Sequence, residues 1–362
     1  MINVTFLMEQ HIGHQTFCQN LRRFIEPSTQ LDSKWVDITY YTEPGYIWER
    51  YPVLPAQIRG SLTARMQVRN GLRQAPYDVA LFNTQVPAVL GSAFLKKKKP
   101  YVIATDITPI QYDEMGEHYN HHSGGNALLN RYKHWKNVSI FKGAARILPW
   151  SSWVGDSLIA DYGVEPDQIE VMPPGVDTTK WRDTSSYNHD GPVRILFVGG
   201  DLYRKGGQLL VSAFRSLPAG VAELILVTRT KLKPTKGMRV YNNMRPNTPE
   251  LMALYESSDI FVLPTQAEAF GIAAVEASAS GLPVVATNIG GLPYIVRDGE
   301  TGFIINAQDE VALANRLHQL IQNHDMRKRF GRAARQRAKT HFDAEKNAMR
   351  VIKILQDVAA GR

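Results

Sequence analysis

Short runs of apolar and β-branched residues alternate with longer amphipathic stretches along the chain, and the alternation is interrupted once near its middle. Before the interruption the runs lie at 3–8, 35–41, 78–82, 101–105, 146–148 and 170–172. After it they lie at 194–198, 223–227, 239–241, 259–263, 283–286 and 302–305. Apolar strands joined by crossover helices are typical of parallel sheets that are covered by helices on both faces. The pattern therefore predicts an α/β protein with two doubly wound, Rossmann-like domains.

The interruption predicts a linker, because it is rich in turn-forming and polar residues and lacks a periodic apolar pattern. It begins with Pro173-Pro-Gly-Val-Asp177. We therefore expect a first domain over 1–172, a linker over 173–190 and a second domain over 191–341. The segment 344–360 has apolar residues at a helical spacing. In open α/β sheets ligands bind beyond the carboxyl ends of the strands, so two such sheets predict a site in the cleft between the domains.

The composition is that of an ordinary globular protein. Hydrophobic residues make up 44% of the 362 positions and charged residues 21%. No apolar run approaches the roughly 18 residues that a membrane span requires, and the first residues lack the basic flank of a signal peptide. Cys18 is the only cysteine, so neither an intrachain disulfide nor a cysteine metal cluster can form. We expect a cytoplasmic protein.

The net charge of +8 favours anionic partners, and the excess of positive charge lies in the C-terminal half. Much of it comes from a helical-looking basic segment over 327–339. Because these charges lack the repeated interleaved aromatics of a nucleic-acid platform, with Phe330 alone among them, we interpret the segment as a solvated helix face and expect no nucleic-acid binding. Lys96-Lys-Lys-Lys99 is either a solvated turn or a contact for anionic lipid headgroups at the inner membrane face. The sequence does not indicate the oligomeric state.

The segment 259–281 carries the most informative chemistry. A predicted strand ends at Pro264, a loop holds Glu268, and a small apolar helix opens near Phe270-Gly271. Glu276 is the only charged residue of that helix, and a buried carboxylate needs a hydrogen-bond donor, for which a nucleotide ribose is one candidate. Glu268 lies at the helix mouth, where free N–H groups and the helix dipole attract anions. Alternatively, Glu268 is a loop carboxylate and Glu276 reaches the surface.

A second motif follows the first strand of the second domain. Gly199 and Gly200 form a turn that lets the backbone approach a ligand, and Arg204 and Lys205 can neutralise a diphosphate as it departs. Alternatively, the two cations are simply solvated. The turn lacks the G-x-G-x-x-G spacing of dinucleotide-binding folds, which argues against a nicotinamide oxidoreductase.

In the N-terminal half we expect residues that bind the acceptor. Gly13 follows the first strand and is expected to permit close approach to the donor, whereas His11 and His14 flank it as either site residues or turn residues. Asp106 follows another strand and is a candidate for binding sugar hydroxyls. His118 lies in a polar segment that either covers the acceptor or forms a loop.

No metal site is expected. The chain contains no D-x-D triplet, and its histidines do not show the H-E-x-x-H spacing. Two cations and a helix N-terminus supply the positive charge that a divalent ion would otherwise provide. We therefore predict neither a metal nor another cofactor.

The segment from Glu268 to Glu276, followed by Ala286–Gly291 and Asp298–Phe303, resembles the donor-site signature of the family 4 (group 1) retaining glycosyltransferases of the GT-B superfamily. The resemblance implies the GT-B architecture, with a C-terminal helix over 342–362 that packs back on the first domain. It implies that Glu268 contacts the donor sugar and that Glu276 holds the ribose.

Further roles follow from the same resemblance. It implies that backbone groups of Phe270, Gly271 and Ile272 meet the sugar and the diphosphate. Many relatives carry arginine where this chain has Gly200, so Arg204 is expected to replace that cation. A cleft histidine of the family is missing near Asp106.

The function implied is transfer of a hexose-type sugar, with retention of anomeric configuration, from a nucleoside diphosphate such as UDP to an acceptor hydroxyl. The acceptor is a glycolipid, a polysaccharide or a small-molecule glycoside. Arg204, Lys205 and Glu268 are the expected catalytic residues. A non-catalytic nucleotide-sugar-binding subunit is the main alternative, and a nicotinamide oxidoreductase is a weaker one. The base, the sugar, the acceptor and the linkage are not readable from the sequence.

Overall fold

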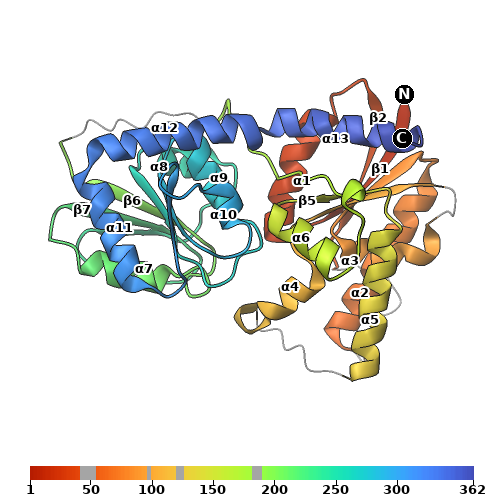
Figure 1. Ribbon diagram of the computed structural model, residues 1–362, viewed down its shortest axis with the longest axis horizontal. Coiled ribbons are helices and arrows are strands. Elements are labelled where there is room, and N and C mark those ends of the chain that lie inside the picture. The colour runs from red at the N-terminus through yellow and green to blue at the C-terminus, as the bar shows by residue number, and fades with distance from the viewer. Residues whose placement is uncertain (41–53, 96–98, 120–125, 182–189) are drawn as a thin grey trace. The chain divides into compact units, whose positions relative to one another are not determined.

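The computed structural model describes residues 1–40, 54–95, 99–119, 126–181 and 190–362 (Figure 1). The chain divides into two compact units. Unit 1 contains Met1–Asp113, Ser123–Pro174 and Ala344–Arg362, and unit 2 contains Glu114–His122 and Gly175–Asp343. The short segment Glu114–His122 belongs to unit 2, whereas we expected it within the first domain. Part of the expected linker, 182–189, lies outside the described residues.

Unit 1 is built on a parallel five-stranded sheet with the order β2-β1-β3-β4-β5. Its strands are β1 (Ile2–Glu9), β2 (Leu31–Ile38), β3 (Val79–Asn83), β4 (Tyr101–Thr105) and β5 (Arg146–Pro149). Its helices are α1 (Ile12–Ile25), α2 (Ala56–Gln74), α3 (Gln85–Gly91), α4 (Pro109–Glu114), α5 (Ala127–Lys142), α6 (Ser152–Ala160) and α13 (Ala344–Ala359). Every residue of β3 and β4 is buried, as expected for central strands of a covered parallel sheet.

The C-terminal helix α13 packs against α1 within unit 1. Its apolar positions Ala348, Val351, Ile352 and Leu355 are all buried. In addition, the side chain of Asn347 donates a hydrogen bond of 3.0 Å to the carbonyl of Pro173. The helix predicted for 344–360 is confirmed, and its apolar face covers the core of unit 1.

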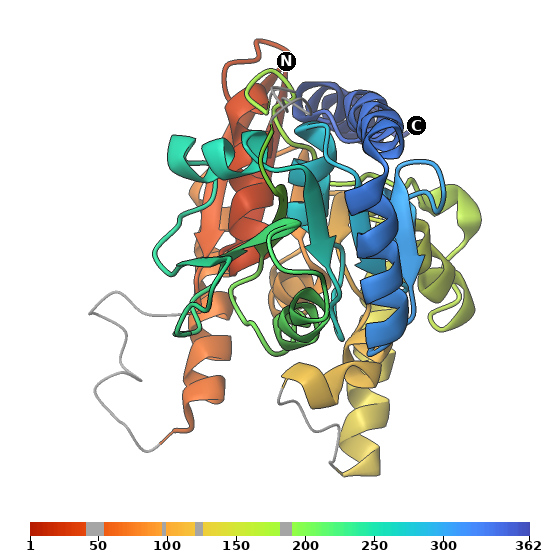
Figure 2. The same cartoon turned by 90° about the vertical axis from the view of Figure 1, so that its left-hand side faces the viewer.

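Unit 2 is built on a parallel six-stranded sheet with the order β11-β10-β9-β6-β7-β8 (Figure 2). Its strands are β6 (Val193–Val198), β7 (Ala222–Val227), β8 (Met238–Tyr241), β9 (Ile260–Leu263), β10 (Val284–Thr287) and β11 (Gly302–Ile305). Its helices are α7 (Gly207–Arg215), α8 (Pro249–Glu256), α9 (Ile272–Ala279), α10 (Leu292–Ile295), α11 (Glu310–Gln322) and α12 (His324–His341). Each predicted C-terminal strand is present, and the α/β fold with two parallel sheets is confirmed.

The strand predicted at 170–172 is wrong. Only Ile169 forms a bridge, to Ile147. The following backbone runs beside β5, and Met172 donates to the carbonyl of Pro149 over 2.8 Å. Pro173 and Pro174 come next, and a proline cannot donate to a strand ladder, so the pairing does not extend.

The interpretation of 327–339 as a solvated helix face is wrong for three of its arginines, which lie on α12. The guanidinium of Arg327 is buried and donates to the last carbonyls of α11, at Leu320 and Ile321. Arg335 donates to the carbonyls of Thr178, Trp181 and Ala279, and Arg337 donates to two carbonyls of α10. Periodicity along one helix cannot reveal such bonds, because the acceptors are carbonyls at the ends of other elements.

Candidate functional site

Two loops at the carboxyl edge of the unit 2 sheet form the candidate donor site. The first follows β6 and leads into α7, and the second follows β9 and leads into α9. The carbonyl of Arg204 in the first loop accepts from the backbone N–H of Gln266, at 2.9 Å, and from the hydroxyl of Thr265, at 3.1 Å. The two loops therefore hold one another in place.

Two glycines let neighbouring backbone segments approach the second loop more closely than any residue with a side chain would permit. Gly206 caps α7 with φ of 72°, and a Cβ there would lie 1.8 Å from the carbonyl oxygen of Pro264. Gly290 has φ of 55°, and a Cβ there would lie 1.8 Å from the carbonyl oxygen of Glu268. Both positions combine a left-handed backbone with direct contact to another backbone segment, so they require glycine. The loop that carries Glu268 is thus enclosed from two sides.

Lys205 and Glu268 form an ion pair between these loops, with the ammonium donating to Oε2 of the carboxylate. Their side chains are only 14% and 12% exposed. Burial lowers the pKa of Lys205, and the charge of Glu268 opposes that shift. Two of the predicted catalytic residues therefore lie in contact in a largely desolvated place, where electrostatic effects on a ligand are stronger than in water.

Arg204 lies in the same first loop, but its guanidinium is held by the protein. It donates to the carbonyl of Ala267 over 2.8 Å and lies 4.7 Å from the ring centroid of Tyr119. Its Nε is 3.8 Å from a carboxylate oxygen of Asp201. These contacts place Arg204 beside the second loop, and its charge lowers the pKa of Lys205.

Glu276 lies on α9 and is 5% exposed. Its hydrogen-bond donor within the protein is the phenol of Tyr255, at the end of α8, over 2.9 Å. Burial raises the pKa of Glu276 from 4.5 to about 7, and the bond from Tyr255 partly opposes this. Sequence reasoning asked for a donor but missed Tyr255. The sequence feature that could have indicated this donor is the phenol of Tyr255 at the end of the apolar run 251–255, just before β9.

The N-terminus of α9 is shaped by Gly271, which has φ of 103°. The side chain of the preceding residue, Phe270, is buried against Phe342. The side chain of Ile272 is only partly buried. The backbone groups at 270–272, which were predicted to contact the donor, therefore lie at the start of α9. Glu268 lies in the loop directly before them.

Arg229 is the residue that sequence reasoning missed most clearly. It follows β7, and its backbone N–H donates to the carbonyl of Gly200 over 3.1 Å. A Cβ on Gly200 would lie 3.0 Å from Arg229 Nε, and a Cβ on Gly199 would lie 3.0 Å from the Cβ of Lys205. Each of the two successive glycines thus lies against a cationic side chain.

In unit 1, the structure brings together two predicted acceptor-side residues. Nε2 of His14, on α1, lies 3.5 Å from Oδ2 of Asp106, which follows β4. His11 lies 3.4 Å from the buried carboxylate of Glu9, which also accepts a hydrogen bond from the hydroxyl of Thr84.

Gly13 and His118 are the remaining residues that were predicted in the N-terminal half. Space beside Gly13 is open, because a Cβ there would meet nothing within 4 Å. His118 belongs to unit 2.

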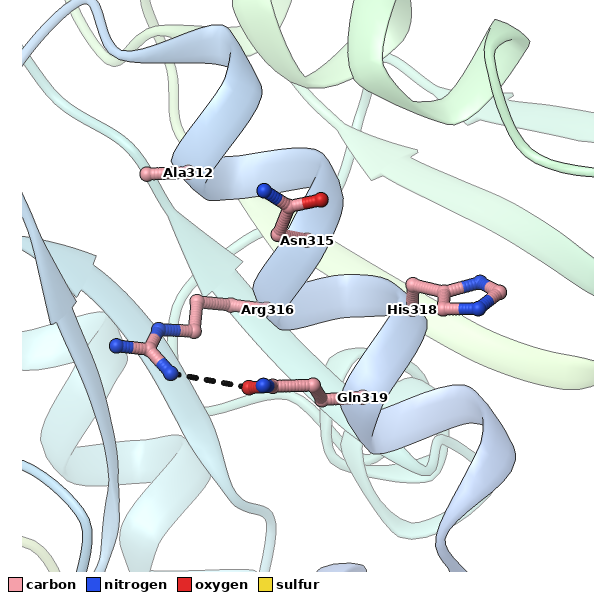
Figure 3. Close-up of a pocket in the computed structure, with 5 residues that line it drawn as sticks. All are labelled: Ala312, Asn315, Arg316, His318 and Gln319. Atoms are coloured by element: carbon pink, nitrogen blue, oxygen red, sulfur yellow. Dashed lines mark hydrogen bonds between the residues drawn. The ribbon is translucent and has the colours of Figure 1, made fainter.

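A shallow hollow on α11 has no connection with these residues. It is lined by Ala312, Asn315, Arg316, His318 and Gln319 (Figure 3). All of these residues come from one helix, and Arg316 donates to Gln319 over 3.0 Å. None of the predicted donor-site residues lines it, so it is not a candidate active site.

Within the described residues, no group of three or more His, Cys, Asp and Glu side chains is placed to hold a metal ion. No described helix is both long and apolar enough to cross a bilayer. Cys18 is buried, and its pKa is raised to about 11 by that burial, so its thiol is not reactive. Metal independence stays a prediction.

The two parallel α/β units define a GT-B fold, and solved structures of that class are similar over the whole chain. Sucrose-phosphate synthase from Thermosynechococcus elongatus has a TM-score of 0.76 at 16% identity, with 100% of both chains covered. The Anabaena protein HepE in complex with UDP-glucose has a TM-score of 0.68 at 17% identity, with 99% of this chain and 100% of HepE covered.

Sequence comparisons add the family. Residues 179–337 match the model described as glycosyl transferases group 1, and residues 36–180 match the model described as glycosyltransferase family 4. The chain belongs to this group 1, family 4 class of glycosyltransferases.

Individual relatives match over part of their length. D-inositol 3-phosphate glycosyltransferase of Pseudarthrobacter chlorophenolicus is 32% identical over 222 residues, which cover 55% of this chain and 53% of the relative. Glycogen synthase of Mycobacterium tuberculosis is 28% identical over 250 residues, which cover 66% of this chain and 59% of the relative. The chain thus spans little more than half the length of these relatives.

Proposed function

We propose that this protein transfers a hexose-type sugar from a nucleoside diphosphate to an acceptor hydroxyl with retention of anomeric configuration. The observation that carries the proposal is the buried pair of Lys205 and Glu268 between the glycine turn of β6 and the N-terminus of α9. UDP is the first candidate for the nucleotide, because the structurally similar HepE was solved with UDP-glucose.

Leaving-group stabilisation is assigned to the cations of the first loop. When the bond between the anomeric carbon and the phosphate oxygen breaks, the electron pair stays on the diphosphate, which gains negative charge. Lys205 and Arg204, together with the N-terminus of α9, then stabilise that charge in a place from which most water is excluded. With this much fixed positive charge, the reaction needs no divalent metal.

Sugar and ribose recognition is assigned to the two glutamates. Glu268 accepts a hydrogen bond from a donor-sugar hydroxyl, and its bond to Lys205 holds the carboxylate in place. Glu276 accepts from the ribose, and Tyr255 orients its carboxylate from inside the protein. Neither glutamate acts as a nucleophile. The acceptor oxygen attacks from the face that the diphosphate leaves, and a diphosphate oxygen takes the acceptor proton.

The acceptor side is assigned to unit 1. His14 and Asp106 form a polar pair there, with His11 and the open space at Gly13 nearby on the chain. His118 is assigned to the same role. A glycolipid, a polysaccharide end or a small-molecule glycoside each provides the hydroxyl that this chemistry requires.

The test is release of nucleoside diphosphate from a panel of UDP-, GDP- and ADP-sugars in the presence of lipid and sugar acceptors. We expect acceptor-dependent release with one base, unchanged by EDTA, and an NMR spectrum of the product with the anomeric configuration of the donor. Binding of a nucleotide sugar without any release would instead indicate a non-catalytic binding subunit. Loss of activity in EDTA would contradict metal independence.

A further inference from the structure

The first half of helix α5 is unusually exposed for an apolar segment. Leu128 is 73% exposed, Tyr132 54% and Trp135 58%. These positions recur at spacings of four and three, so their side chains form one stripe along the helix. The buried residues of the helix are Ile140 and Phe141, near its end. In Figure 1, α5 extends away from the sheet of its unit, and Figure 2 agrees.

The charges on α5 all have one sign. Arg131, Lys133 and Lys136 accompany the apolar stripe, Lys142 ends the helix, and no Asp or Glu occurs between Ala127 and Lys142. The ammonium of Lys136 lies 5.1 Å from the ring centroid of Trp135. An exposed apolar stripe that is accompanied only by cations matches a surface that is both apolar and negatively charged.

We propose that α5 docks the protein on an anionic lipid surface. Leucine, tyrosine and tryptophan side chains enter the boundary between headgroups and acyl chains, where an aromatic ring with a polar atom is favoured. The three cations beside them bind the acidic headgroups. A protein partner would require acidic residues opposite the cations and a defined shape, whereas a lipid surface requires only the combination that α5 presents.

The experiment is co-sedimentation of the full chain with vesicles of phosphatidylglycerol or of phosphatidylcholine. We expect binding to phosphatidylglycerol that weakens when salt is raised from about 0.1 M to about 1 M. The variant R131Q/K133Q/K136Q should bind on the order of a hundredfold more weakly, because each cation near an anionic surface strengthens binding by about fivefold to tenfold. The variant L128S/W135S should also lose binding.

Matched variants keep this test specific. K231Q/K233Q/K236Q removes the same charge from exposed positions of unit 2, and V311S replaces a side chain that is 71% exposed on α11. Both should bind vesicles like the wild-type chain, and all variants should keep the wild-type melting temperature. Wild-type binding that is absent, equal for both lipids, or lost equally in the unit 2 variants would overturn the proposal. A change of oligomeric state in L128S/W135S, without a change in vesicle binding, would identify a second copy as the partner instead.

A different observation concerns the donor site and rests on the proposed function. Backbone conformation at Gly200 is open to any residue, because its φ is not positive, but the guanidinium of Arg229 fills the space where a side chain would begin. Arg229 is exposed, and among the residues that the structure describes it forms no ion pair. Lys205 lies against the neighbouring Gly199. The glycine turn is therefore flanked by a cation on each side.

We infer that Arg229 is a second diphosphate-binding cation of this site, which reaches the glycine turn from the end of β7. Arg204, which the sequence suggested for that role, already donates to Ala267 and stacks on Tyr119. The guanidinium of Arg229 instead covers the turn that a diphosphate would approach. A guanidinium can bind two phosphate oxygens at once, so its place beside Lys205 suits a diphosphate.

The test compares the binding of UDP, GDP, ADP and uridine by calorimetry. R229A should weaken the binding of the best-bound diphosphate by about tenfold or more, because a charge-assisted hydrogen bond is lost. It should leave the binding of uridine unchanged. R239A is the matched control and should bind like wild type. It removes an arginine on β8 that pairs with Glu223 on β7. Adding G200R to R229A should restore binding, because the new guanidinium extends into the space that Arg229 vacates.

The outcomes separate this inference from the proposed function. If the wild-type chain binds a diphosphate and R229A binds it equally well, Arg229 has no such role although the donor site stands. If R229A weakens the binding of uridine as much as the binding of the diphosphate, the effect is structural and the inference is wrong. If none of the three diphosphates binds the wild-type chain, the proposed function fails and this inference fails with it.

Discussion

Glu276 shows at the scale of one residue how a ligand-binding group can lower the stability of the free protein. Its carboxyl group is buried, and that burial raises its pKa from 4.5 to about 7. Between these two values the folded protein binds a proton that the unfolded chain has released, so stability falls as the pH rises through this window. Above about pH 7 the folded protein carries the full cost of a buried charge, which is about 3 kcal/mol.

This cost gives a prediction for Glu276→Gln. Glutamine keeps an oxygen that can accept from Tyr255 but carries no charge, so the variant should be more stable than wild type by about 3 kcal/mol near pH 8 and nearly equal near pH 4.5. Urea unfolding at the two pH values measures the difference. Glu300→Gln, at an exposed position, should change little at either pH. An equal effect of Glu276→Gln at both pH values would mean that the charge is not what destabilises the protein.

Residues of the candidate site were predictable where their chemistry is unusual for their surroundings. Glu276 was identified because it is the only charge on an apolar helix, and Lys205 because it follows a glycine turn. Tyr255 and Arg229 were not, because neither is unusual in its own segment. Their roles depend on contacts with Glu276, 21 residues away, and with Gly200 on the neighbouring strand's loop. Sequence periodicity does not give such contacts.

At the scale of elements, the loop between β9 and α9 depends on the close approach of Gly290 to the carbonyl of Glu268. Gly290→Ala should cost about 3 kcal/mol of unfolding free energy, because it adds a backbone clash to an unfavourable positive φ. Gly220 is the matched position: its φ is 84°, but nothing lies within 4 Å of a Cβ there. Gly220→Ala should therefore cost only about 1 kcal/mol. Equal losses in the two variants, measured by urea unfolding, would show that the contact with Glu268 has no effect on stability.

Strands were more predictable than the surfaces of helices. The central strand β9 and its neighbour β10 are buried on both faces, so each appears as a continuous apolar run in the sequence. The stretch at 170–172 is similar in composition, but prolines follow it and only one bridge forms. The arginines of α12 look solvated in the sequence, yet three of them bind carbonyls of other elements. Helix ends leave carbonyls unpaired, and the sequence does not show which arginine reaches them.

At the scale of the whole molecule, the chain has the GT-B fold, and its two units were expected from the pattern of strands. The excess of positive charge was harder to interpret. The lysines at 96–98 lie outside the described residues, and Lys99 pairs with Asp78 over 3.3 Å. The basic segment at 327–339 is partly structural. The exposed cations of α5 were not singled out, because whether Trp135 and its neighbours are buried or exposed depends on the tertiary fold.

The catalytic pair is the feature on which the proposed function depends most. Lys205 and Glu268 are 63 residues apart in the sequence, and the structure brings them into contact in a place with little exposure to water. Lys205→Met keeps an unbranched side chain of similar length but removes the charge. The double variant Lys205→Met/Glu268→Gln also removes the carboxylate that would otherwise be left buried without its partner, which keeps the folded state accessible.

The most direct measurement is the rate of acceptor-dependent nucleoside diphosphate release at a saturating concentration of the donor that the panel identifies. Lys231→Met, at an exposed lysine of unit 2, is the matched control. We expect the control to turn over like wild type, and both Lys205→Met and the double variant to be at least about a hundredfold slower with unchanged folding. Turnover by the folded double variant at the wild-type rate would contradict the assignment of this site.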